Sequence, residues 1–108
     1  MKVSELVNSG GFEAISLPSP DREIVGAYAG DLLSWVMGRA EEGNAWITIM
    51  SNVNVIAVAT LADVSCVILA EGVTLDDEVL KVAHEKDVNV LVSELPVYEV
   101  ALRLGGMI

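Results

Sequence analysis

Cationic side chains are scarce in this chain of 108 residues, in which six Lys plus Arg stand against sixteen Asp plus Glu. The formal net charge is therefore −10 at pH 7. Proteins bind phosphate backbones and anionic lipid surfaces through clustered cations, and this sequence contains no such cluster. We expect a protein with no nucleic-acid partner and no membrane partner, in which the acidity serves solubility.

Cysteine and histidine occur once each, as Cys66 and His84. A single cysteine excludes an internal disulfide and a metal site made only of cysteines from this chain. Cys66 begins the apolar stretch CVIL, and a reactive thiol needs electropositive surroundings, so we expect it to be buried and inert. His84 falls on the polar side of a predicted helix, where we expect a solvated side chain rather than a general base.

The common motifs of catalytic and cofactor-binding sites are absent as well. The sequence contains no G-x-G-x-x-G, G-x-x-x-x-G-K-[ST], G-x-S-x-G or C-x-x-C. Asp76, Asp77 and Glu78 lack the spacing of a calcium loop and suit the first turn of a helix. We predict no catalytic residue, no metal and no cofactor, and a protein that is not an enzyme.

No apolar stretch reaches the roughly 18 uninterrupted residues of a membrane helix. The longest candidate is interrupted by Asn54, Thr60, Asp63 and Ser65, and the first residues lack the apolar core of a signal peptide. The chain has instead 53% hydrophobic residues and a mean hydropathy of +0.54. These values predict one well-filled domain over residues 1–108, located in the cytoplasm.

Hydrophobic periodicity predicts ten elements in the order α-β-β-α-β-α-β-α-β-α. We expect helices at 3–9, 31–40, 52–62, after residue 74 and from residue 96, and strands at 12–18, 22–30, 45–50, 65–72 and 88–94. From residue 45 onward the repeated strand–helix unit implies parallel strands with helices on both faces. We predict an α/β fold of three layers, α/β/α, with a mixed, largely parallel sheet of about five strands.

The segment 52–62 is open to two interpretations. Its β-branched residues favour a strand. A parallel connection between the strands before and after it requires a crossover, which is usually helical. Ile56, Ala59 and Thr60 would share one face of such a helix, and we predict that the helix forms.

Local residue types also predict where the helices begin and end. The expected N-terminal caps are Ser4, Asp31, either Ser51 or Asn52, and Thr74. The helix 31–40 is expected to end at Gly43 and to have an inward face formed by Leu33, Val36, Met37 and Ala40. In the last helix, Glu99 and Arg103 have the spacing of an ion pair.

The positions of the two tryptophans indicate that Trp46 lies in the core and that Trp35 lies on a surface between two subunits. Trp46 lies in a strand that contains no charge, so we expect it in the core. Trp35 lies at the edge of the apolar side of its helix, and Met37 extends that surface. Apolar surface that the core does not cover often lies between two subunits, and we therefore predict a homodimer.

Ligands of open α/β sheets bind beyond the carboxyl ends of the strands, where helix N-termini present free N–H groups. Three predicted strand ends carry small or polar residues, namely AGD at 29–31, SN at 51–52 and EGVT at 71–74. The candidate ligand-binding residues are Gly30, Asp31, Ser51, Asn52, Glu71, Gly72 and Thr74. The alternative is that strand–helix turns use these residue types for backbone reasons alone. Arg22 and Arg39 become candidate cations of the site only if the fold brings them there.

The segments IVGAYAGDLLSWVM, AWITIMSN and SCVILAEGVTLDDEVLKVAHEKDVNVLVSELPVYEVA resemble the DRTGG domain family, over about residues 3 to 104. The features that match are Gly26-Ala27, Ile68-Leu69, the acidic helix after Thr74, and Leu95-Pro96 with Tyr98 and Glu99. The resemblance implies a small regulatory module similar in fold to the N-terminal domain of HPr kinase. Such modules are fused to phosphotransacetylases, CBS-domain proteins or pyrophosphatases, or stand alone.

The signature of the family is altered in this chain. Its Asp-Arg aligns with Ser51-Asn52, and its Thr-Gly-Gly aligns with Ala70-Glu71-Gly72. Loss of the arginine removes a natural partner for phosphate, and Glu71 adds a charge that repels one.

Two functions are therefore compared. The first is a non-catalytic regulatory or ligand-sensing module that binds a small metabolite or nucleotide at the carboxyl ends of the strands. The second is a protein-interaction subunit without a small ligand. Stand-alone members of the family are often encoded beside iron–iron hydrogenase subunits, so the resemblance implies an accessory role in a redox complex of that type.

Overall fold

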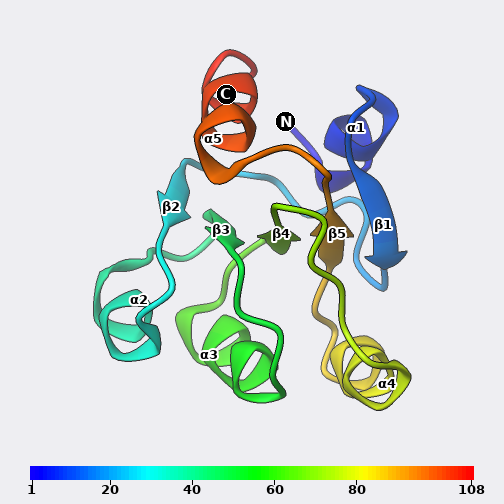
Figure 1. Cartoon of the computed structure of the whole chain (residues 1–108), viewed down its shortest axis with the longest axis vertical. Coiled ribbons are helices and arrows are strands. Elements are labelled where there is room, and N and C mark those ends of the chain that lie inside the picture. The colour runs from blue at the N-terminus through cyan, green and yellow to red at the C-terminus, as the bar shows by residue number, and fades with distance from the viewer.

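Five helices enclose a five-stranded sheet in the computed structural model, which describes residues 1–108 (Figure 1). The helices are α1 Val3–Asn8, α2 Leu33–Arg39, α3 Asn54–Ala62, α4 Asp77–Glu85 and α5 Val97–Gly105. The strands are β1 Glu13–Ser16, β2 Ala27–Ala29, β3 Ala45–Thr48, β4 Cys66–Leu69 and β5 Val90–Val92. The predicted order of elements is confirmed, although the strands are shorter than expected. None of the helices has both the length and the apolar character needed to cross a bilayer.

The sheet is mixed, as predicted, and its strand order is β1-β5-β4-β3-β2. The strands β2 to β5 run parallel to one another, whereas β1 pairs antiparallel with β5 at one edge. In that pair Glu13 lies opposite Val92. The first residues of β1 therefore lie beside the carboxyl end of β5.

The helices form two layers, which confirms the predicted α/β/α arrangement. Helices α1 and α5 cover one face of the sheet, and α2, α3 and α4 cover the other (Figure 1). Leu6 and Leu104 belong to the core under the first layer, whereas Trp46 and Ala83 belong to the core under the second. Because both faces are covered, β3 and β4 are buried along their whole length. Trp46 is fully buried, as predicted.

The segment from residue 54 to residue 62 is a helix, and the alternative of a strand is wrong. Strands β3 and β4 are adjacent and parallel, so the chain has to cross back between them, and α3 makes this crossover. Ile56 and Ala59 are buried as expected. Thr60, which follows Ala59 on the same helix, is exposed, and its hydroxyl donates to the Ile56 carbonyl at 2.9 Å.

The predicted caps of α1 and α4 are wrong, because neither helix has a side-chain cap of the expected kind. Ser4 lies inside α1, and the Glu5 carboxylate accepts a hydrogen bond from the Lys2 N–H at 2.8 Å. Helix α4 begins at Asp77, so Thr74 lies in the loop before it. At α3 the N-cap position is Val53 and has no side-chain cap, so the prediction of Ser51 or Asn52 as the cap is wrong; the Asn52 side chain, one residue earlier, accepts from the Asn54 N–H at 2.9 Å.

Helix α2 differs from its predicted end and inward face. It ends at Arg39, and Gly43 occupies a turn beyond it at a φ of +84° rather than capping the helix. Val36 is fully buried, but Met37 is half-exposed and turns away from the core. The buried side of α2 is therefore narrower than its hydrophobic residues predict.

Cys66 and His84 are placed as predicted, the first buried in β4 and the second exposed on α4. Desolvation by burial raises the pKa of the Cys66 thiol to about 12, and the charge of Arg22 lowers it by a smaller amount. At neutral pH the thiol is therefore protonated and unreactive.

Candidate functional site

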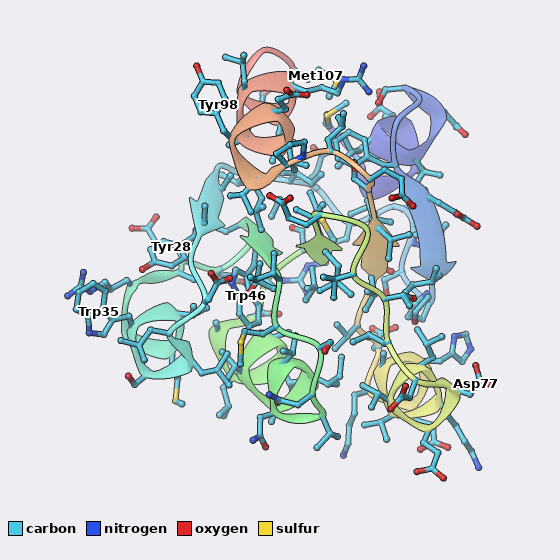
Figure 2. All side chains as sticks on the ribbon, viewed as in Figure 1. Tyr28, Trp35, Trp46, Asp77, Tyr98 and Met107 are labelled. Carbon is cyan, nitrogen blue, oxygen red and sulfur yellow. The ribbon has the colours of Figure 1, made fainter.

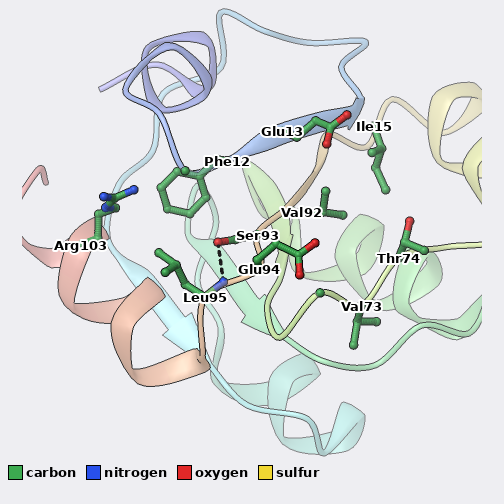
Figure 3. A pocket seen from close by; sticks show the side chains of 12 residues that line it. Phe12, Glu13, Ile15, Val73, Thr74, Val92, Ser93, Glu94, Leu95 and Arg103 are labelled. Carbon is green, nitrogen blue, oxygen red and sulfur yellow. Dashed lines mark hydrogen bonds between the residues drawn. The ribbon is translucent and has the colours of Figure 1, made fainter.

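A cleft of about 700 Å³ lies at the end of the sheet where β4 and β5 finish and β1 begins (Figure 3). It is lined by residues from the loop before β1, from β1 itself, from the loops after β4 and β5, and from α5. The six that carry its chemistry are Phe12, Glu13, Thr74, Ser93, Glu94 and Arg103. The cleft combines charged, hydroxyl and aromatic groups at the edge where parallel sheets bind their ligands.

Backbone hydrogen bonds join the two loops that form the floor of the cleft. The Gly72 N–H donates to the Ser93 carbonyl at 3.0 Å, and the Glu71 N–H donates to the Leu95 carbonyl at 2.9 Å. The pairing of β4 with β5 thus continues beyond the strands. It gives the loops a defined geometry without any contribution from a ligand.

The deepest side chains in the cleft are Phe12 and Ser93, which are 6% and 4% exposed. The Ser93 Oγ accepts a hydrogen bond from the Leu95 N–H at 3.2 Å, as the dashed line in Figure 3 marks. Its own O–H donates to no protein acceptor. A buried hydroxyl with a free hydrogen can donate to a ligand at little desolvation cost.

Three charged groups line the rim, and none of them has a partner of opposite charge. The ion pairs of the chain lie elsewhere, at Glu23, Asp21 and Asp63. Glu13 and Glu94 make no ion pair or side-chain hydrogen bond. The Arg103 Nη1 donates to the Gly10 carbonyl at 3.0 Å, so the expected pairing of Arg103 with Glu99 is wrong.

Two of these charged groups occupy space that a glycine leaves open. A Cβ atom at Gly11 would lie 1.9 Å from Arg103 Nη1, and one at Gly72 would lie 2.7 Å from Glu94 Oε2. Both glycines have positive φ, +85° and +74°, which L-residues rarely adopt. The glycines therefore leave room for both charged groups at these positions.

Of the seven predicted ligand residues, Gly72 and Thr74 line this cleft and the other five do not. Gly30 and Asp31 lie after β2 and serve the fold. The Gly30 carbonyl accepts from the Trp46 indole N–H at 2.9 Å. The Asp31 Oδ1 accepts from the Thr48 hydroxyl at 2.8 Å and from the Ile49 N–H at 3.0 Å. Asp31 thus joins β2 to β3, and the prediction that it caps α2 is wrong.

The remaining three candidates lie at the ends of β3 and β4. Ser51 is exposed and makes no hydrogen bond through its side chain. Asn52 bonds the start of α3, as described above. The Glu71 Oε2 accepts from the Val97 N–H at 3.0 Å, so this carboxylate lies at the N-terminus of α5.

Sequence reasoning did not find Phe12, Glu13, Ser93, Glu94 or Arg103. The fold brings Arg103 to the cleft, whereas Arg22 pairs with Asp63 at 2.7 Å and Arg39 lies 3.8 Å from the Trp35 ring centre. No histidine or cysteine lines the cleft, and no group of three or more His, Cys, Asp or Glu is placed to hold a metal. The arrangement can bind through charge, hydrogen bonds and apolar contact.

A second exposed surface lies along β2, the other edge of the sheet. Trp35 on α2 is 52% exposed and Tyr98 on α5 is 74% exposed, and Figure 2 shows both with Tyr28 on this side of the molecule. The Gly26 carbonyl and the Gly30 N–H bond to β3. Because backbone groups of a strand alternate in direction, those of Ala27 and Ala29 point away from the sheet, unpaired.

Comparisons with known proteins agree on the kind of domain. Residues 23–107 match the family model of the DRTGG domain. Among solved structures, the chain is similar to the CBS and DRTGG domains of the regulatory region of Clostridium perfringens pyrophosphatase, complexed with an activator, diadenosine tetraphosphate. The TM-score is 0.70 at 18% identity, over 95% of this chain and 45% of that one. A search of the curated proteins finds no match.

Proposed function

The chain belongs to the DRTGG domain family, and from that premise we propose that it is a non-catalytic regulatory module that senses a small ligand. The ligand would be a small metabolite or a nucleotide bound in the cleft between β1, β4 and β5. The observation that carries the proposal is the Ser93 hydroxyl, buried in the cleft floor with its hydrogen undonated.

The composition of the cleft supports binding rather than turnover. Ser93 has no histidine beside it, because His84 is exposed on α4 and does not line the cleft. A serine becomes a nucleophile when a base within hydrogen-bond reach takes its proton. Glu13, Glu94 and Arg103 supply charge that a bound molecule can neutralise.

The solved relative makes regulation by a bound small molecule a reasonable role for this domain type. That structure is of a regulatory region with an activator bound. By analogy, the present chain would report the presence of its ligand to another protein, through a change in stability or shape. The residues that line the cleft of this chain determine which ligand it would bind.

A thermal-shift screen against small metabolites and adenine nucleotides tests the proposal. We expect at least one compound to raise the Tm, since a ligand that binds only the folded state stabilises it. Thr74→Trp, at the exposed rim, should fill the cleft and abolish that shift. Thr60→Trp, another exposed threonine outside the cleft, should leave it intact. The proposal would be contradicted if no compound raised the Tm, or if the rise in Tm persisted in Thr74→Trp.

The β2 edge favours a second candidate function, which is assembly. We propose that two copies pair through their β2 strands about a two-fold axis, so that Ala27 and Ala29 exchange backbone hydrogen bonds. The stretch from Ile24 to Gly30 contains no charge, so two chains of net charge −10 can approach there with least repulsion. An accessory role in a hydrogenase-type redox complex would use this same surface.

Sedimentation velocity over a range of concentrations tests the pairing. Trp35→Glu and Tyr98→Glu should each shift the chain toward monomer, because each places a carboxylate beside the two-fold axis. Leu61→Glu is the control, since Leu61 is 70% exposed on α3, outside the β2 edge. A wild-type chain that stays monomeric at high concentration would rule out the homodimer.

A further inference from the structure

We propose that the ligand of the cleft is a dipolar small molecule, with an ammonium group at one end and a carboxylate at the other. This inference rests on the cleft being the ligand site proposed above. Glu13 and Glu94 would receive the ammonium, Arg103 the carboxylate, and the apolar middle of the ligand would cover Phe12.

The charges of the cleft are separated by sign. Figure 3 shows Glu13 and Glu94 on one side, with Arg103 on the opposite side, beyond Phe12. Neither carboxylate is neutralised by Arg103, because no ion pair joins them. A molecule that spans the cleft would therefore meet negative charge at one end and positive charge at the other.

The walls between the two ends are apolar. Phe12, Val92 and Leu95 line this part of the cleft, and Phe12 is nearly buried. The free O–H of Ser93 lies among them and would donate to the carboxylate that the ligand presents to Arg103, which is the only group of such a ligand that contains oxygen. This middle suits a short aliphatic chain, because its methylene groups need no polar partner.

Charge balance disfavours a polyphosphate as the occupant. A phosphate group near Arg103 would also face the field of Glu13, Glu94 and a chain of net charge −10. An ammonium near the two carboxylates is attracted by the same field. The dipolar molecule places an opposite charge beside the acidic end and beside the basic end of the cleft, whereas a polyphosphate is matched only at Arg103.

Glycine at positions 11 and 72 leaves room for two of the charged side chains of the cleft. The side chains of Arg103 and Glu94 occupy the space that a Cβ at these positions would need. Arg103 and Glu94, which would bind the opposite ends of the ligand, thus each lie beside a glycine. The Arg103 guanidinium is also held by its hydrogen bond to the Gly10 carbonyl, which limits the entropy that binding at this end has to overcome.

Isothermal titration calorimetry with linear ω-amino acids tests the inference. The probes run from glycine through β-alanine and γ-aminobutyrate to ε-aminocaproate, with butylamine, butyrate and ATP as comparisons. We expect binding to reach a maximum at one chain length, and butylamine and butyrate to bind at least tenfold more weakly than that probe.

Matched variants test which side chain binds the ammonium end of the ligand and which binds the carboxylate end. Glu94→Gln and Arg103→Gln should each weaken the best probe at least tenfold and make it no better than its monofunctional counterpart. Glu85→Gln and Lys81→Gln, on the exposed part of α4, should leave the Kd unchanged. Circular dichroism and Tm confirm that each variant is folded.

The outcomes separate the inference from the proposed function. Binding of ATP or of a singly charged probe in the cleft, lost in Thr74→Trp, would overturn the dipolar ligand and leave the sensing role standing. Dipolar binding that Glu94→Gln and Arg103→Gln do not weaken would overturn the inference as well. A chain that binds no probe and no compound of the metabolite screen would overturn both.

Discussion

Adjacent glycines before β1 offer a matched pair of substitutions. Gly10 and Gly11 have nearly equal positive φ, +88° and +85°, but only a Cβ at Gly11 would meet a side chain, that of Arg103. Gly10→Ala and Gly11→Ala should each lower the free energy of unfolding by about 1 kcal/mol, because alanine is strained in this conformation. Urea denaturation measures this common loss.

Only the second substitution should affect ligand binding. In Gly11→Ala the Arg103 guanidinium has to move, so the Kd of a ligand identified in the screen should rise, whereas in Gly10→Ala it should not. Equal affinities for both variants would mean that the position of Arg103 does not matter for binding.

Because of Cys66, the free energy of unfolding should fall as the pH rises through the alkaline range. Folding raises the pKa of its thiol from 9.0 to about 12, so between these values the unfolded state loses a proton that the folded state keeps. The stabilising contribution is complete below pH 9 and declines as the pH rises toward 12, by at most about 1.4 kcal/mol per unit.

Urea denaturation of the wild type and Cys66→Ala, from pH 8 to pH 11, measures this decline. The variant should be less stable at pH 8 by roughly 1 kcal/mol because it loses buried volume. Its stability should also fall less steeply, since only the remaining groups titrate. Parallel curves for the two proteins would show that the thiol is not shielded from water.

At the scale of elements, the carboxylate of Glu71 supplies a cap from outside the helix it serves. Helix α5 follows Pro96, which has no side-chain cap to offer, and the Val97 N–H bonds to Glu71 instead. Glu71→Ala should destabilise the chain by about 1 kcal/mol, since it removes both an acceptor and a negative charge from the N-terminus.

Glu71→Gln provides the comparison for this cap, because the amide oxygen can still accept from Val97. It should recover part of the loss, and the recovered part should be insensitive to salt. The readout is Tm at low and high ionic strength. Equal Tm values for Glu71→Ala and the wild type would show that water satisfies the Val97 N–H as well as Glu71 does.

The same contacts explain which element boundaries could be predicted from the sequence. Periodicity and the crossover rule correctly located all ten elements, including α3, because both depend on local pattern and on short connections. Helix caps were less predictable. Asp31 is a good capping residue, yet its bonds to Thr48 and Ile49 across the sheet replace the cap. A tertiary partner overrode a local preference.

At the scale of the whole molecule, the cleft could be located only in part. Gly72 and Thr74 follow a parallel strand, so the rule on strand ends found them. Phe12 and Arg103 are 91 positions apart in the sequence (103 − 12), and they meet because β1 is antiparallel and α5 returns beside it. No local pattern in the sequence encodes that meeting.

Amide chemical-shift mapping tests the ligand site most directly. The ¹⁵N-labelled chain is titrated with the best ω-amino acid probe and, separately, with ATP, and the backbone shifts are followed to saturation. The account predicts that the dipolar probe produces saturable shifts concentrated at Gly11, Gly72, Ser93 and Glu94, with none at Ala29 or Leu61. Shifts concentrated along β2, or the absence of saturable shifts with every probe, would contradict it.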